Sequence, residues 1–170
     1  MRIRNGSRGV TLIELLFGVA IVGILAGLAF PSMRTALRAG SVRSATFELM
    51  AGLQQARASS IAAARPGVFC LTEKTGSGNE ACLPDGGTAS AWRAFLEADG
   101  KQLPLAARDL PPGIRLKANR ARLAFWPDSL SASTATLTIC DATGLARPRE
   151  IVINQAGRLR LGESEEAACG

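Results

Sequence analysis

The sequence contains no histidine and no tyrosine. Histidine is the usual general base near neutral pH and a frequent metal ligand, so its absence removes the commonest starting point for catalysis and zinc binding. Aromatic residues make up only 5% of the chain, so the core must consist chiefly of Leu, Ile, Val and Ala. Charged residues amount to 20% against 47% hydrophobic residues, which excludes intrinsic disorder. The 170 residues accommodate one domain and one additional segment.

The four cysteines, Cys70, Cys82, Cys140 and Cys169, show no CxxC spacing, which argues against a zinc or redox site. Two disulfides in an oxidising compartment fit this pattern, and so do four buried thiols. We expect disulfides in the most local connectivity, Cys70–Cys82 and Cys140–Cys169. With no histidine and no recognisable pair of carboxylates, we expect no enzymatic activity, no metal and no cofactor.

The N-terminus begins with a short basic segment, residues 1–9, followed by 21 residues that only Glu14 interrupts with a charge, residues 10–30. As a helix, this apolar segment is about 31 Å long, enough to cross the hydrocarbon core of a bilayer. A secretory signal is cleaved after its apolar region, whereas the only short junction that ends in glycine here, at Gly9, precedes it. Cleavage at Gly9 would therefore retain the helix in the mature protein.

Glu14 is unusual because a carboxylate in an apolar membrane segment costs about 3 kcal/mol. Cleavage after Gly9 would create a positively charged partner, the new terminal amine of Val10, on the same chain or on a neighbouring subunit. A plain signal anchor with Glu14 near the lipid headgroups is the alternative.

The run Gly9-Val10-Thr11-Leu12-Ile13-Glu14-Leu15-Leu16 resembles the prepilin motif of type IV pilins and type II secretion pseudopilins. The resemblance implies that a prepilin peptidase cuts after Gly9 and methylates Val10, although the family more often has Phe there. It also implies that Glu14 aids assembly by meeting the terminal amine of an adjacent subunit. Pro31 stands where many members of the family bend the helix.

Arginines flank the apolar segment on both sides, so charge alone fixes its orientation only weakly. The cysteines place residues 32–170 on the oxidising side. We expect a single-pass inner-membrane protein with a periplasmic ectodomain that later enters an extracellular pilus. The expected partners are other major and minor pilins, the prepilin peptidase and the inner membrane.

Residues 31–65 continue the helix, because apolar or small side chains recur there at steps of three or four. These positions are Val42, Ala45, Leu49, Leu53, Ala56, Ser60 and Ala63. The sequence Arg65-Pro66-Gly67 ends the helix.

Residues 66–170 form a β-rich globular domain in which short β-type runs alternate with Gly, Pro, Asp and Asn. We expect antiparallel sheets packed on the helix, an α+β fold, with residues 74–91 mostly in a loop. The predicted strands cover residues 68–72, 92–97, 114–118, 122–126, 134–140, 150–154 and 158–161.

Trp92-Arg93-Ala94-Phe95 followed by Asp99-Gly100 resembles a hairpin of the GspH/FimT group of minor pilins and pseudopilins. A late strand with Cys140, the strand Ile151-Val152-Ile153 and a final hairpin led by Gly157 are similar to that group too. The resemblance is greatest to FimT-type minor pilins, with FimU-type pilins next.

Arginines at a spacing of two are the best candidates for a binding function. Gly157 marks a turn, after which Arg158 and Arg160 face one side of a strand while Leu159 faces the core. Arg147 and Arg149 have the same spacing. A solvated polar face on amphipathic strands explains this pattern equally directly.

The run Gly157-Arg158-Leu159-Arg160 is similar to a Gly-Arg-x-Arg element of FimT-like minor pilins, which bind DNA for uptake in natural transformation. The resemblance implies that Gly157, Arg158, Arg160, Arg147 and Arg149 bind double-stranded DNA through its phosphates, without base specificity. The alternative is a purely structural minor pilin, or a type II secretion pseudopilin, that primes or caps the filament.

Overall fold

The computed structural model describes residues 11–73, 81–128 and 131–163. One long helix, α1 (Leu12–Ala63), precedes two five-stranded antiparallel sheets, which confirms the α+β fold. The first sheet has the order β4-β3-β1-β6-β7 and the second the order β10-β9-β8-β5-β2. Their strands are β1 (Gly67–Thr72), β2 (Thr88–Ala89), β3 (Ala91–Ala98), β4 (Lys101–Asp109), β5 (Ile114–Ala118), β6 (Arg122–Trp126), β7 (Ser131–Ala132), β8 (Ala135–Asp141), β9 (Arg149–Ile153) and β10 (Leu159–Glu163).

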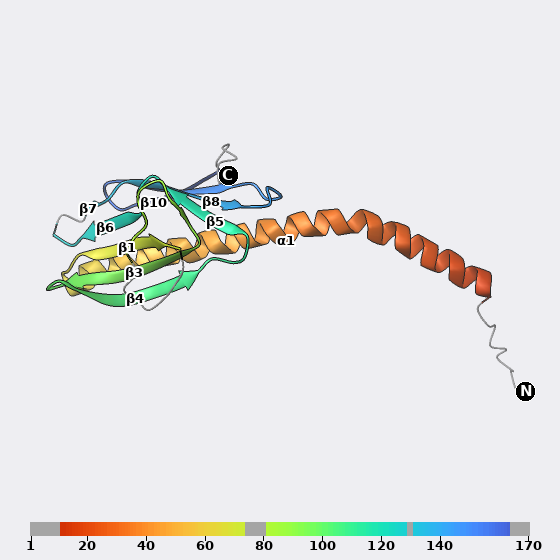
Figure 1. Cartoon of the computed structure of the whole chain (residues 1–170), viewed down its shortest axis with the longest axis horizontal. Helices are drawn as coiled ribbons and strands as arrows, with labels where there is room; N and C mark the ends of the chain where they lie inside the picture. Colours follow the sequence, from red (N-terminus) through yellow and green to blue (C-terminus); the bar gives the residue numbers. More distant parts are fainter. Residues whose placement is uncertain (1–10, 74–80, 129–130, 164–170) are drawn as a thin grey trace, which may run out of the picture.

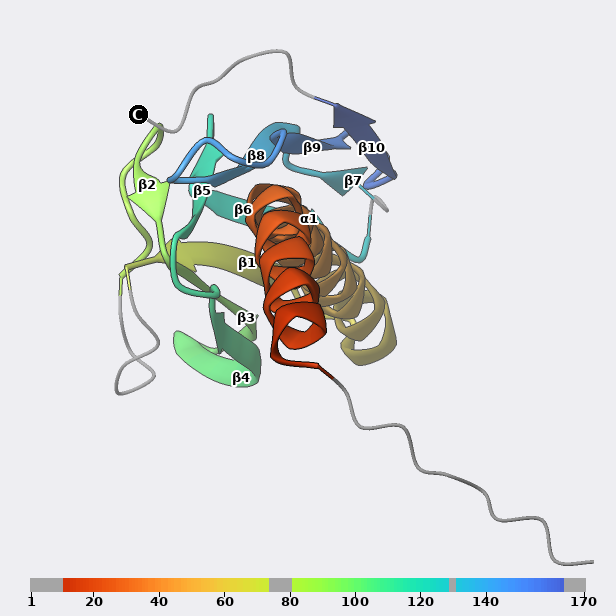
Figure 2. The ribbon, with the colours of Figure 1, turned by 90° about the vertical axis from the view of Figure 1, so that its right-hand side faces the viewer.

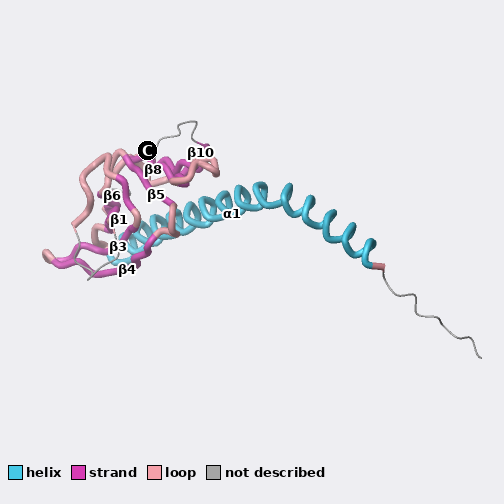
Figure 3. The backbone as a smooth tube through the Cα atoms, turned by 45° about the vertical axis from the view of Figure 1, so that its right-hand side comes forward, coloured by secondary structure: helices cyan, strands magenta, loops and turns pink. Residues whose placement is uncertain are grey.

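Helix α1 has 52 residues and is therefore about 78 Å long. Its N-terminal half projects from the domain as a curved, uninterrupted rod, whereas its C-terminal half lies against the sheets (Figures 1 and 3). The buried face of the packed half carries the expected stripe from Val42 to Ser60. Ala63, expected in the same stripe, is exposed, because the helix ends there and Ala64 turns the chain with a left-handed φ of 49°.

The first sheet packs closely on the helix at one glycine. The ring of Trp92 on β3 lies over Gly52, where a Cβ would stand 2.5 Å from the Trp92 Cη2 atom. Phe69 on β1 stacks on the same indole with 5.0 Å between the ring centroids. A side chain at position 52 would therefore displace the aromatic pair that joins the sheet to the helix.

The second sheet contributes the other wall of the core. Leu116, Ile139 and Ile151 from its three central strands are fully buried and belong to the same apolar cluster as Leu49 and Leu53 of the helix. Viewed from the end of the helix, the two sheets curve around one side of α1 (Figure 2).

Three strands were not predicted from the sequence. The short strands β2 and β7 have two residues each. Strand β4 has nine, and it pairs with β3 through a tight turn at Asp99 and Gly100, whose φ angles are 50° and 74°. Because β4 is largely exposed along its whole length, its sequence lacks the alternation that identifies a half-buried strand.

The expected disulfide between Cys70 and Cys82 is present, with 5.3 Å between the two Cα atoms. It ties the buried centre of β1 to the segment that leads into β2. Cys169 lies outside the described residues, so its pairing with Cys140 stays a prediction.

Candidate functional site

The expected processing site lies just before the described part of the chain, since Gly9 and Val10 are both outside it. Helix α1 begins immediately afterwards with Thr11 as its N-cap, whose hydroxyl oxygen accepts a hydrogen bond from the Glu14 amide at 3.4 Å. From Leu12 to Gly27 every side chain is exposed, and the helix is long and apolar enough to cross a membrane. This half of α1 has the form of a membrane anchor.

Glu14 occupies the third position of the helix, in the pattern Thr-x-x-Glu that forms capping boxes. Its negative charge also stands near the positive end of the helix dipole. The Thr-x-x-Glu pattern is visible in the sequence, but the prediction for Glu14 considered only a charged partner and not this role at the helix start. Pro31 lies within the helix, its side chain is outside the described part, and its bending role stays a prediction.

Hydrogen bonds within the turn before β10, and one from the helix, fix the conformation of this turn. The Asn154 side chain accepts from the Arg158 amide at 2.8 Å, and the Asn154 carbonyl accepts from the Gly157 amide at 2.8 Å. Gly157 has a φ of 68°, and Arg57 of the helix donates from Nη1 to its carbonyl at 2.9 Å. Gly157 is buried against Arg57 and shapes the turn. Its expected part in DNA binding stays a prediction.

Arg158 and Arg160 emerge from this turn on the outer side of the second sheet, and both are exposed. Leu159 between them packs on the core, as expected. Arg160 stands opposite Val152 of β9, and Val152 stands opposite Thr136 of β8. The two arginines are thus held by a fixed turn and a paired strand.

The same outer surface continues across the sheet to β5. Arg115 and Lys117 alternate there with buried residues and point outward. Lys117, Thr138 and Glu150 stand opposite one another on adjacent strands and line a shallow groove of about 230 Å³. We call this surface the outer face: Arg158, Arg160, Arg115 and Lys117, with the single carboxylate Glu150 among its described residues.

The structure does not bring the remaining two predicted arginines to the outer face. Arg149 shares the parity of Ile151 and Ile153 on β9, whose side chains are buried in the core, so it points toward the helix side of the sheet. Arg147 precedes β9 and lies with Arg149 beside α1. Of the five residues predicted to bind DNA, two therefore lie on the outer face, two lie beside α1, and Gly157 lies in the turn before β10.

Asp141 anchors the turn that carries the chain from β8 toward Arg147. Burial of its carboxyl would raise its pKa, but this effect is outweighed by hydrogen bonds from the Thr143 hydroxyl and amide and the Leu145 amide, and by the guanidinium of Arg38. The pKa of Asp141 is therefore lowered. Arg38 of the helix approaches Asp141 at 3.9 Å and donates to the Pro112 carbonyl at 3.0 Å.

The chain was compared with known families and structures. A family model described as Type II transport protein GspH matches residues 45–157. The chain belongs to this family. A second model, the prokaryotic N-terminal methylation motif, matches residues 4–30, and this motif together with the apolar helix fits a membrane-anchored pilin.

Two solved structures of other proteins have a fold similar to that of this GspH-family chain. The type IV minor pilin FimU of Pseudomonas aeruginosa is 22% identical over 75% of this chain and 95% of its own, with a TM-score of 0.55. The minor pseudopilin EpsH from the Type 2 Secretion System of Vibrio cholerae is 13% identical over 75% of this chain and 99% of its own, with a TM-score of 0.52. A search of curated proteins finds no match. At these identities the two likenesses show that the chain has the fold of these proteins.

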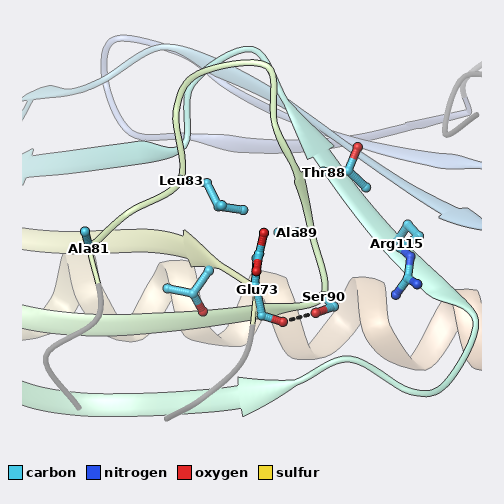
Figure 4. Close-up of a pocket in the computed structure, with 8 residues that line it drawn as sticks. Glu73, Ala81, Leu83, Thr88, Ala89, Ser90 and Arg115 are labelled. Carbon is cyan, nitrogen blue, oxygen red and sulfur yellow. Dashed lines mark hydrogen bonds between the residues drawn. The ribbon is translucent and has the colours of Figure 1, made fainter. Parts of the chain in front are cut away.

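One pocket of this GspH-family chain has a volume of about 660 Å³ and lies between β2 and the segments on either side of residues 74–80 (Figure 4). The Ser90 hydroxyl donates to the Glu73 carbonyl at its edge, and Arg115 lies across from them. Its described lining contains no histidine, lysine or cysteine, and no group of three potential metal ligands occurs among the described residues.

Proposed function

We propose that the protein is a minor type IV pilin that binds double-stranded DNA without sequence preference for uptake in natural transformation. The proposal assigns phosphate contact to Arg158 and Arg160 on the outer face, with Arg115 and Lys117 extending the positive surface. The observation that carries it is the tethered turn: both arginines are exposed, yet the backbone beneath them is fixed by Asn154 and Arg57.

This arrangement suits phosphate binding in two ways. Each guanidinium can bind a phosphate with two parallel hydrogen bonds. Arginines on a rigid support lose less conformational entropy on binding than arginines on a mobile tail. The described part of the chain places no helix on this side of the sheet to enter a groove, so the expected readout is of the phosphate backbone alone.

The test is a fluorescence anisotropy titration of the full-length protein in neutral detergent against duplexes of unrelated sequence, at several salt concentrations. The variant Arg158→Gln/Arg160→Gln should weaken binding by a similar factor for every duplex. Its log–log salt slope should fall by about two, because two phosphate contacts are lost.

The matched control is Lys101→Gln/Arg108→Gln, which removes two exposed charges from β4 on the other sheet. It should change affinity little. If the wild type shows no salt-sensitive affinity, or both double variants behave alike, the outer face is only solvated. The second candidate would then hold: a structural minor pilin or pseudopilin that primes or caps a filament, as the family and fold permit.

A further inference from the structure

A groove runs along the side of α1 where the helix leaves the domain. Its floor is the helix surface from Thr35 to Arg43, and its wall is the connection from β8 to β9, with Arg147 and Arg149. It encloses about 650 Å³ and adjoins a hollow of about 410 Å³ between Phe30, Arg34 and Leu145. We call these two spaces together the juxtamembrane groove.

The position of the groove follows from the length of the apolar helix. From Leu12 to Phe30 the helix rises about 28 Å, which matches the hydrocarbon core of a bilayer. Arg34 lies one turn further, about 6 Å, with its guanidinium 5.5 Å from the centre of the Phe30 ring. The hollow at Leu145 therefore lies at the level of the lipid headgroups, and Arg43, about 14 Å above Arg34, lies just beyond them.

The charge of the groove has one sign. The ionisable side chains among its described lining residues are all arginines: Arg34, Arg43, Arg147 and Arg149. The carboxylate nearest in sequence to this wall on β8, Asp141, is buried and faces Arg38. Glu150 belongs to the outer face, and Glu163 stands opposite Arg149 in the β9–β10 register. Because Arg43 lies beyond the headgroups, Arg34 and Arg147 are the better probes of the groove.

Leu145 completes the arrangement. Its side chain is 47% exposed at the tip of the wall, beside Phe30, which is 64% exposed. An exposed apolar pair below several arginines is the pattern that places apolar atoms at the acyl boundary and guanidinium groups among phosphates.

We propose that the juxtamembrane groove binds the headgroup of an anionic phospholipid while the subunit is still anchored in the membrane. Arg34 and Arg147 hold the phosphate, and Leu145 with Phe30 contacts the glycerol and the first part of the acyl chains. The lipid thereby holds the domain against the membrane surface. This inference rests on the membrane-anchored state and not on DNA binding.

The test uses the full-length protein purified in detergent with equal amounts of phosphatidylglycerol and phosphatidylcholine, and native mass spectrometry to measure the ratio of the two lipids retained. The wild type should prefer phosphatidylglycerol. The variant Arg34→Gln/Arg147→Gln should lose about tenfold or more of this preference, because each basic residue near an anionic surface contributes to it. The control Lys101→Gln/Arg108→Gln has the same change in net charge and should keep the preference.

A phosphatidylglycerol with a photoreactive headgroup locates the site and should cross-link to residues 142–149. DNA affinity of Arg34→Gln/Arg147→Gln should equal that of the wild type, which separates this inference from the proposed function. No lipid preference in the wild type, or an unchanged preference in the variant, would overturn it. Unchanged lipid preference with poor incorporation into filaments would instead assign the groove to an acidic segment of a neighbouring subunit.

Discussion

At the scale of single residues, Glu14 combines two properties that the structure separates. Its amide donates to the hydroxyl oxygen of Thr11, the N-cap residue, a local contact that fixes the start of the helix. Its carboxylate stands free for a partner that the resemblance to pilins places on another subunit. Substitutions can distinguish these properties, because glutamine keeps the capping-box sequence pattern, which allows Glu or Gln at this position, and removes the charge.

We therefore predict that Glu14→Ala and Glu14→Gln both remain in the membrane but enter filaments poorly. Loss of a charge pair that is buried from water costs several kcal/mol, so incorporation should fall at least about tenfold. Quantitative immunoblotting of sheared filaments against the membrane fraction measures it. Near-normal incorporation of Glu14→Gln alone would show that capping, not charge, is the role of this residue.

Asp141 makes stability depend on pH. Its pKa is lowered in the folded state, so folding is favoured by this group above the unfolded pKa of about 3.9 and loses that contribution as pH falls through the folded value. We predict that the free energy of unfolding drops below about pH 4, and that Asp141→Asn flattens this drop while costing about 1–3 kcal/mol at neutral pH. Urea unfolding followed at several pH values checks it; parallel curves for the two proteins would contradict it.

The arginines show what residue spacing can and cannot predict. Arg147 with Arg149 and Arg158 with Arg160 have the same spacing, yet only the second pair reaches the outer face. The parity of Arg149 with Ile151 and Ile153 was present in the sequence and would have placed it inward. The contact between Arg57 and Gly157 could not have been predicted, because one hundred positions separate them and only the packed fold brings them together.

At the scale of elements, the sequence located the helix and the half-buried strands well. Strands β5 and β6 begin and end where they were predicted, since buried and exposed side chains alternate along β5 and both strands are bounded by turn residues. Strand β4 was missed because it is exposed and carries Pro104, which stands next to an irregularity in its pairing with β3. The Asp99-Gly100 turn was nevertheless a strong hairpin signal that implied a second strand.

The disulfide connectivity is a prediction at the scale of elements, and one of its two predicted pairs, Cys70–Cys82, is present in the structure. Cys70–Cys82 leaves Cys140–Cys169 as the expected second pair, tying the C-terminal tail to β8. It should contribute roughly 3–4 kcal/mol by restricting the unfolded chain. Peptide mapping without reduction should yield both linked peptides, with Cys70–Cys82 as internal control, and a peptide joining Cys82 to Cys140 would contradict the assignment.

At the scale of the whole molecule, the protein consists of a projecting apolar rod and a domain wrapped around the other end of the same helix. We propose the boundaries 1–9, 10–30, 31–65 and 66–170 for leader, membrane segment, amphipathic helix and globular domain. This division requires that maturation leave the rod intact.

We predict cleavage between Gly9 and Val10 with methylation of the new N-terminus, as the match to the N-terminal methylation motif suggests. Intact-mass measurement of the membrane-purified protein should give a chain that starts at methylated Val10. A chain that retains Met1, or one that begins after Phe30, would contradict the pilin-type maturation. Protein from cells without a prepilin peptidase provides the uncleaved control.

The bond from Arg57 to the Gly157 carbonyl has a mechanical consequence. A pull on Arg158 or Arg160 need not travel across β9, β8 and β5 to reach the rest of the subunit, because the turn beneath them is fastened directly to α1. The helix is the longest element and the one that leaves the domain. Tension applied at the outer face therefore has a short route to the axis of the subunit besides the route through the sheet.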